Sequence, residues 1–118
     1  MGSLGIGSIV IDCTGFERML GFWQEALHYV PAYPPKNGWV ILKDPNGRGP
    51  NVSLNLTSEG PLDQYRLHLD LYTDDQAGEV KRLVQLGATL HRTPGRGEDF
   101  VVLADPDGNL FCVVDTKR

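Results

Sequence analysis

The sequence predicts an α+β domain in which two β-α-β-β-β units form one curved mixed sheet around a cleft. Two observations lead to this fold class. The halves of the 118-residue chain repeat one another at a nearly constant offset, and strands in both halves alternate between apolar and polar residues. A chain of this length suits one compact domain. We expect that domain to span residues 4–117, built of modules of about 4–60 and 61–117.

The clearest part of the repeat is a strand that runs into a tight turn. Residues 39–47 read WVILKDPNG and residues 100–108 read FVVLADPDG. Each copy has an aromatic residue, three aliphatic residues and an Asp-Pro-(Asn/Asp)-Gly turn, in which proline presets φ and glycine accepts a positive φ. Each copy is followed by a further strand pattern. The same strand-turn-strand element is therefore predicted in both halves.

A strand, a helix and another strand precede this element in each half. Helices are expected at 16–27 and 75–86, where apolar residues recur at spacings of three and four, with Asp74 or Asp75 as the second N-cap. Eight strands are expected, which is too many for the competing ferredoxin-like β-α-β-β-α-β arrangement. They cover about 8–13, 29–34, 38–43, 51–57, 66–72, 88–93, 99–104 and 109–115.

Strict alternation assigns two faces to these strands, because successive side chains point to opposite sides. One face should pack against the helices; it carries Val52, Leu54, Leu56, Leu67, Leu69 and Leu71. The other face is mostly polar. Since strands from both halves share this pattern, a sheet that encloses a ligand-binding cleft is favoured over polar faces that meet only solvent. The candidate ligand-binding residues are Asp12, Trp39, Asn51, Ser53, Asn55, Arg66, Asp70, Tyr72 and Cys112.

Composition excludes several other functions. The formal net charge is -4 and the basic residues are scattered, which disfavours nucleic acid as a partner. No stretch approaches the roughly 20 apolar residues of a membrane span, and the N-terminus lacks the pattern of a secretory signal. We therefore expect a cytoplasmic protein without a membrane partner. Two cysteines are too few for a disulfide framework, and both are expected to pack as small apolar residues.

The order of several local motifs resembles the vicinal oxygen chelate superfamily. These motifs are the pair Phe22-Trp23 late in the first helix, the Leu-His-Leu-Asp-Leu strand at 67–71, the helix end at 86–88 and the turn DPDGN at 105–109. The superfamily includes glyoxalase I, extradiol dioxygenases, and fosfomycin-resistance and bleomycin-binding proteins. The resemblance spans nearly the whole chain, is closest to small glyoxalase-like proteins and implies the glyoxalase/bleomycin-resistance fold.

The resemblance also implies where a metal would bind. Enzymes of the superfamily hold a divalent ion with His, Gln or Glu at four inward positions, two in each half. In this chain those positions correspond to Ser8, to Ser53 or Asn55, to His68 and to Cys112. Only His68 is a customary ligand, although Cys112 as a thiolate suits a soft metal. No cofactor is predicted outright, and a divalent metal such as Zn, Ni, Mn or Fe is left open.

Three functions follow from these residues. The preferred one is a small-molecule binding protein of the glyoxalase/bleomycin-resistance type, which binds a drug or metabolite and has lost the usual metal site. The alternative is a divalent-metal-dependent lyase, isomerase or dioxygenase, and the resemblance also implies a homodimer. The third is metal-free catalysis with His68 as the base. Asp70 lies two residues away, about 7 Å along the strand, and is expected to share a substrate with His68 but hardly to orient it. The sequence leaves open whether the chain is an enzyme.

Overall fold

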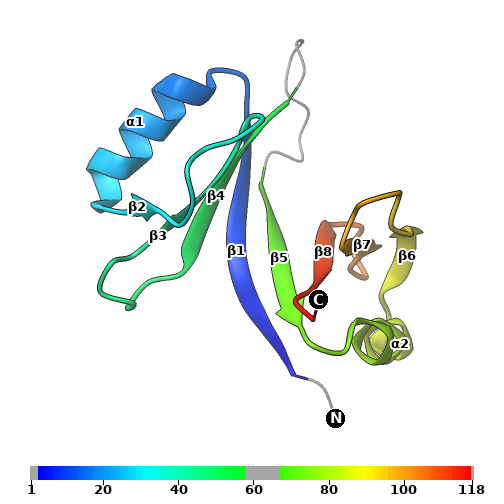
Figure 1. Cartoon of the computed structure of the whole chain (residues 1–118). Helices are drawn as coiled ribbons and strands as arrows, with labels where there is room; N and C mark the ends of the chain where they lie inside the picture. The colour runs from blue at the N-terminus through cyan, green and yellow to red at the C-terminus, as the bar shows by residue number, and fades with distance from the viewer. Residues whose placement is uncertain (1–2, 58–66, 118) are drawn as a thin grey trace. The chain divides into compact units, whose positions relative to one another are not determined.

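The computed structural model describes residues 3–57 and 67–117. Its elements follow the order β-α-β-β-β twice, and its strands form a mixed sheet (Figure 1). This arrangement confirms the predicted α+β fold class. The first module contains β1 (Leu4–Cys13), α1 (Phe16–Leu27), β2 (Val30–Pro31), β3 (Trp39–Lys43) and β4 (Asn51–Leu56). The second contains β5 (Leu67–Thr73), α2 (Gln76–Leu86), β6 (Thr89–Arg92), β7 (Phe100–Ala104) and β8 (Leu110–Asp115).

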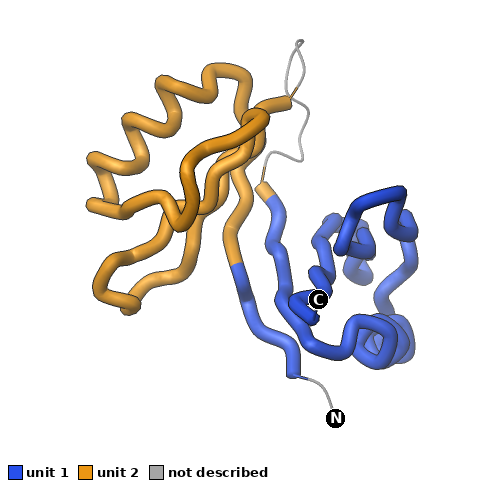
Figure 2. The backbone as a smooth tube through the Cα atoms, viewed as in Figure 1, with its two compact units in different colours: residues 1–7, 68–118 blue, residues 8–67 orange. Residues whose placement is uncertain are grey.

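The chain divides into two compact units (Figure 2). Residues 1–7 and 68–118 form unit 1, and residues 8–67 form unit 2. In unit 2 the strand order is β2-β3-β4-β1, and in unit 1 it is β5-β8-β7-β6. In both, the first and last strands of the module pair in parallel, whereas the remaining pairs are antiparallel. The sequence repeat therefore corresponds to a repeated strand topology.

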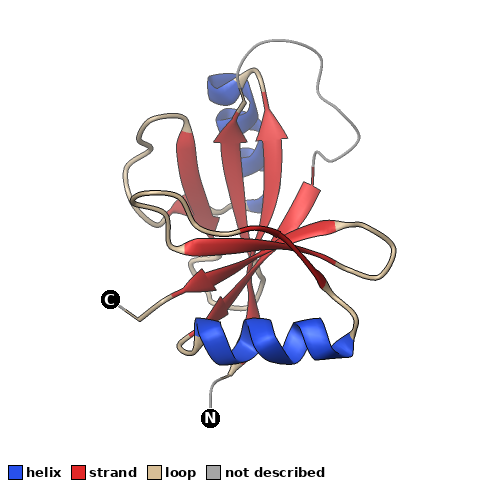
Figure 3. Ribbon diagram, turned by 90° about the vertical axis from the view of Figure 1, so that its right-hand side faces the viewer, coloured by secondary structure: helices blue, strands red, loops and turns tan. Residues whose placement is uncertain are grey.

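Each unit buries one face of its sheet beneath its own helix. The core of unit 2 consists of Cys13, Val40, Leu42 and Leu54, against which Phe16, Met19, Leu20 and Trp23 of α1 pack. The core of unit 1 consists of Val101, Leu103 and Val113, against which Val80 and Leu83 of α2 pack. Figure 3 shows α2 along one side of its strands. The other face of each sheet is thus left for groups that do not belong to these cores.

The two Asp-Pro turns form the same hydrogen bonds. The carboxylates of Asp44 and Asp105 each accept the backbone N–H two residues later, at 2.8 and 2.9 Å. Gly47 and Gly108 close the turns with φ of 67° and 91°, values that favour glycine. The Asn109 side chain and nearby backbone N–H groups hold the pKa of Asp105 below its usual range. The repeated Asp-Pro-(Asn/Asp)-Gly sequence therefore forms the same turn in both modules.

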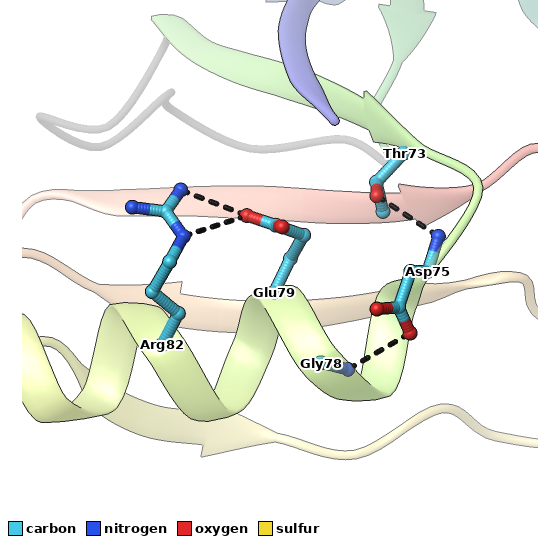
Figure 4. A network of polar contacts seen from close by, with 5 residues as sticks. All are labelled: Thr73, Asp75, Gly78, Glu79 and Arg82. Atoms are coloured by element: carbon cyan, nitrogen blue, oxygen red, sulfur yellow. Dashed lines mark hydrogen bonds and ion pairs between the residues drawn. The ribbon is translucent and has the colours of Figure 1, made fainter. Parts of the chain in front are cut away.

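The helices agree closely with the expected ranges. Helix α1 has the predicted bounds, and α2 begins after Asp75, which settles the N-cap in favour of Asp75 over Asp74. The Asp75 carboxylate accepts the N–H of Gly78 at 3.1 Å, and its own N–H donates to Thr73 Oγ1 at 3.0 Å (Figure 4). One turn later the Arg82 guanidinium donates twice to buried Glu79. Neither described helix is long and apolar enough to cross a membrane.

The expected strand at 29–34 is wrong in its length. Only Val30–Pro31 forms a strand, paired with Lys43 and Leu42 of β3, and beyond it the Ala32 N–H donates to the carbonyl of Ile41 at 2.8 Å. Proline has no N–H to donate to a ladder, and Pro34 and Pro35 follow closely. The proline content therefore shortens this edge strand.

The expected burial of the leucine faces is also partly wrong. Val52 and Leu54 are buried, but Leu56 is 46% exposed, Leu67 62% and Leu69 38%. Helix α1 contacts β4 and α2 contacts β8, and a helix about 10 Å wide cannot cover every strand of a four-stranded sheet. Alternation predicted which side these leucines share, but not how much of that side a single helix covers.

Replacing Leu103 with alanine tests the core of unit 1. Its side chain is fully buried, so the change should lower the free energy of unfolding by about 2–5 kcal/mol. The control is Leu90→Ala on neighbouring β6, because Leu90 is 49% exposed, and its expected cost is below about 1 kcal/mol. Urea unfolding monitored by circular dichroism measures both. Equal losses would contradict the assignment of this core.

Replacing Asp105 with asparagine tests the turn carboxylate. Because the pKa of Asp105 is lowered in the folded state, its charge stabilises the fold above the ordinary carboxyl range. That contribution disappears as the pH falls through the lowered pKa. Wild type should therefore be more stable than Asp105→Asn at pH 6, and the difference should shrink by pH 3. Thermal unfolding across this range measures it, with Asp107→Asn as the control for net charge. A constant difference would refute the role of the charge.

Candidate functional site

Unit 2 brings three of the predicted residues into one row. Asp12 on β1 lies opposite Asn55 on β4, and Asn55 lies opposite Trp39 on β3. Directly paired residues point to the same face of a sheet. The Asn55 side-chain amide donates to Asp12 Oδ1 at 3.2 Å. A carboxylate, an amide and an indole are thus presented side by side on partly buried positions.

A second pair of predicted positions in unit 2 is closed by its own hydrogen bond. Ser8 Oγ and Ser53 Oγ lie 2.6 Å apart, and both serines are fully buried. A buried hydroxyl without a partner is costly, so each serine provides the partner that the other needs. Asn51, which is partly buried, lies opposite Ser8 in the ladder between β1 and β4. These two hydroxyls are therefore structural neighbours rather than free donors.

Unit 1 brings together His68, Asp70 and Cys112. Asp70 on β5 lies opposite Cys112 on β8, and one donor atom from each of the three residues lies within 4.8 Å of the others. His68 Nε2 is 3.4 Å from Asp70 Oδ1, with side chains 24% and 13% exposed. We refer to these three residues as the unit 1 triad. Its imidazole, carboxylate and thiol face the side of the sheet opposite the core residue Val113.

The side chains of His68 and Asp70 lie closer together than their separation along the strand suggested. Their backbone positions are about 7 Å apart along the strand, but both side chains project from the same face. They lean toward one another and bring imidazole and carboxylate to within 3.4 Å. Distance along the backbone therefore underestimated what two flexible side chains can bridge.

The remaining predicted residues have different outcomes. Tyr72 on β5 continues the face of the triad, and its ring lies so close to Gly7 that a Cβ there would clash with it. Arg66 lies outside the described residues. Cys13 belongs to the core of unit 2, as expected, and burial together with the nearby Asp12 charge raises the pKa of its thiol. Cys112 is outside both cores, so its expected role as a core residue is wrong.

The sequence interpretation missed an ion pair on the side of unit 1 that carries the triad. Arg92 lies opposite Val102, and Val102 lies opposite Cys112. The Arg92 guanidinium donates to Glu98 Oε1 at 2.7 Å and lies 5.3 Å from the centroid of the Phe100 ring. The Arg92 hydrogen bond lowers the pKa of Glu98, and Glu98 raises that of Arg92. Strand alternation could not have predicted this position, because a register shift between Leu90 and Arg92 places Arg92 opposite Val102 while Leu90 lies opposite the core residue Leu103.

Comparison with known proteins identifies the family. A family model described as a glyoxalase-like domain matches residues 8–114. The chain belongs to this family. No curated protein sequence matches it.

Solved structures with this fold cover nearly the whole glyoxalase-like chain. A glyoxalase/bleomycin resistance protein/dioxygenase superfamily member from Vibrio splendidus 12B01 has a TM-score of 0.64 at 16% identity, covering 98% of this chain and 99% of its own. Methylmalonyl-CoA epimerase from Mycobacterium tuberculosis has a TM-score of 0.64 at 16% identity, and the match covers 97% of this chain and 89% of the epimerase chain. The Mn(II)-bound glyoxalase from Novosphingobium aromaticivorans has 0.63 at 17%, covering 96% of this chain and 40% of its own. These likenesses confirm the predicted fold.

The metal arrangement implied for the superfamily does not fit this glyoxalase-like domain. Two of its four positions are Ser8 and Ser53, whose hydroxyls are buried and bonded to each other. At the alternative second position, the Asn55 amide is bonded to Asp12. Neutral hydroxyl groups are poor ligands for a divalent transition metal. Residues 8–57 therefore supply no customary pair of metal donors at these positions.

The Ser8–Ser53 pair predicts a strongly non-additive pair of substitutions. Ser8→Ala alone leaves a buried Ser53 hydroxyl without its partner and should cost about 1–3 kcal/mol of unfolding free energy. The double variant with Ser53→Ala leaves no orphaned hydroxyl, so it should cost clearly less than the sum of the single variants. Urea unfolding of the four proteins in the cycle measures the coupling. Additive losses would show that the two hydroxyls do not depend on one another.

Proposed function

We propose that this glyoxalase-like domain binds a small molecule, a drug or metabolite, through side chains on the helix-free faces of its sheets and without the four-donor metal site of its superfamily. The observation that carries the proposal is the hydrogen bond between Ser8 and Ser53, which occupies two expected ligand positions with a buried, self-satisfied pair. A fold whose metal donors are replaced in this way retains sites for recognition, but not that metal chemistry.

The row of Asp12, Asn55 and Trp39 supports recognition of an organic molecule. The carboxylate and amide provide hydrogen-bonding groups at partly buried positions, and an aromatic ring beside them offers apolar contact. Cations are attracted both to carboxylates and to the faces of aromatic rings. We therefore expect a cationic ligand to bind better than an anionic one. The proposal includes a cytoplasmic homodimer, as superfamily members of this length commonly form.

A second candidate is enzymatic, and the contact between His68 and Asp70 favours it. A carboxylate 3.4 Å from an imidazole nitrogen can orient the ring for general acid-base catalysis. The solved structures with this fold include an epimerase and a Mn(II)-bound glyoxalase. Isomerase, lyase or dioxygenase activity is therefore the class to test. Conversion of a bound ligand, seen as new signals in its NMR spectrum and lost in His68→Gln, would favour this candidate.

The binding proposal predicts ligand-dependent stabilisation in the presence of a metal chelator. We expect a hit from a panel of cationic, neutral and anionic drug-like molecules and metabolites to raise Tm by several degrees at concentrations well above its Kd. Calorimetry should then show at least about tenfold weaker binding to Asp12→Asn, which loses one charged partner.

The matched control is Asp74→Asn, an exposed carboxylate between β5 and α2. It makes the same change of net charge and should leave the affinity unaltered. If both variants bound the ligand more weakly by the same factor, the effect of Asp12→Asn would be due to net charge alone. Binding that appears only when a divalent metal replaces the chelator would overturn the metal-independent proposal.

A further inference from the structure

Asp12 is a partly buried carboxylate without a basic partner. Its Oδ1 accepts a hydrogen bond from Asn55 Nδ2 at 3.2 Å, which is a bond to a neutral amide, and it forms no ion pair within the described part of the chain. By contrast, the buried carboxylate of Glu79 is bonded twice by Arg82. A negative charge withdrawn from water is costly when no cation balances it. Asp12 therefore offers its charge to a cation from outside the chain.

The Asn55 amide determines how this carboxylate is presented. An ionised carboxylate can only accept hydrogen bonds, so the amide turns its NH₂ group toward Asp12 and its carbonyl oxygen away. Among the residues that the structure describes, no donor is bonded to Asn55 Oδ1 or to Asp12 Oδ2. The pair therefore presents two hydrogen-bond acceptors, one of them charged, and a single bond positions both.

A primary ammonium group fits these two acceptors best. It carries three N–H donors and no acceptor, whereas a quaternary ammonium group has no donor at all. A guanidinium pairs most strongly when two parallel N–H donors meet both oxygens of a carboxylate, but Asp12 Oδ1 is already bonded to Asn55. Charge alone attracts all three kinds of cation. The hydrogen-bonding pattern is therefore what separates them.

Trp39 lies across Asn55 from the carboxylate. Asp12 pairs with Asn55 between β1 and β4, and Asn55 pairs with Trp39 between β4 and β3, so the amide stands between the charge and the indole. Two strand spacings, about 9.6 Å of backbone, separate the outer positions. A ligand that uses both ends needs an ammonium group and an aromatic ring joined by a short chain that passes over Asn55. The spacing therefore favours an arylalkyl amine over a compact cation.

The next row on the same face provides apolar and closed groups. It consists of Ile41, Ser53 and Val10, which are paired across the same three strands. Ser53 is fully buried and bonded to Ser8, and Val10 is only 1% exposed. The polar contacts of a ligand at this end of the face are therefore those of the outer row.

We propose that the row of Asp12, Asn55 and Trp39 binds arylalkyl primary amines. The ammonium group donates to Asp12 Oδ2 and Asn55 Oδ1, and the aromatic ring packs against Trp39. Asn55 sets the specificity, because it positions the carboxylate and adds the second acceptor. The inference rests on the proposed function and narrows its ligand from any cation to a hydrogen-bonding amine of defined length. All three residues belong to unit 2.

A series of small amines tests the inference on the wild-type protein in the presence of a chelator. In NMR titrations, 2-phenylethylamine should bind at least about tenfold more tightly than its N,N,N-trimethyl analogue, which keeps the charge and the ring but has no N–H donor. It should also bind at least about tenfold more tightly than 2-phenylethanol, which lacks the charge. Affinity should rise from benzylamine to 3-phenylpropylamine, because the longer chain reaches across Asn55.

Variants assign these effects to residues. Asn55→Leu should abolish the preference for the primary over the trimethyl amine, and Asn55→Gln, which keeps the amide, should restore part of it. Trp39→Leu should weaken binding of 2-phenylethylamine about tenfold but leave the weaker binding of butylamine unchanged. The controls Asn46→Leu and Tyr33→Leu alter an exposed amide and an exposed aromatic ring of unit 2 and should leave all affinities unchanged. Circular dichroism and Tm monitor the fold of each variant.

Equal binding of the primary and trimethyl amines would overturn the inference, and so would equal binding of benzylamine and 3-phenylpropylamine. The wild-type series decides the question even if Asn55→Leu does not fold. If no amine binds, but another molecule of the ligand panel does and is weakened by Asp12→Asn, the inference fails and the proposed function stands. Binding of neither the panel nor the amines would refute both.

Discussion

Each unit of this protein has four strands and a single helix with which to bury one face of those strands. In unit 1, α2 packs on Val101, Leu103 and Val113, and in unit 2, α1 packs on the corresponding apolar cluster. Because side chains alternate along a strand, the positions between these core residues must point the other way. The site residues occupy those intervening positions. Core formation therefore decides which side chains are available for recognition and which are not.

The two units carry different chemical groups at these intervening positions. In unit 2 the polar positions are bonded among themselves, Ser8 with Ser53 and Asp12 with Asn55. In unit 1 an imidazole, a carboxylate and a thiol converge. Hydroxyl and amide groups favour hydrogen bonding to organic molecules, whereas imidazole and thiolate favour soft metals. A duplicated fold has thus retained its topology while the chemistry of its two faces has diverged.

The contact between His68 and Asp70 shows where reasoning from strand geometry alone was insufficient. A separation of two residues along a strand suggests independence, yet these side chains lie 3.4 Å apart. The same limitation applies to Arg92, which shares a row with Cys112, with Val102 between them, only because β6 pairs with β7 and β7 pairs with β8. Strand alternation identifies a face, but only pairing identifies neighbours. Site residues from different strands therefore need the register before they can be grouped.

The sequence by itself determined the repeat, the order of elements, both helices and the Asp-Pro turns, because periodicity, capping and turn preferences act within a few residues. Tertiary structure decided what depends on long-range packing. It left Leu67 and Leu69 exposed, since one helix cannot cover the whole sheet face, and it joined the hydroxyls of Ser8 and Ser53 across 45 residues of chain. It also set Asp70 beside Cys112 through the parallel pairing of β5 with β8. Local chemistry thus specified the modules, and strand register assembled their sites.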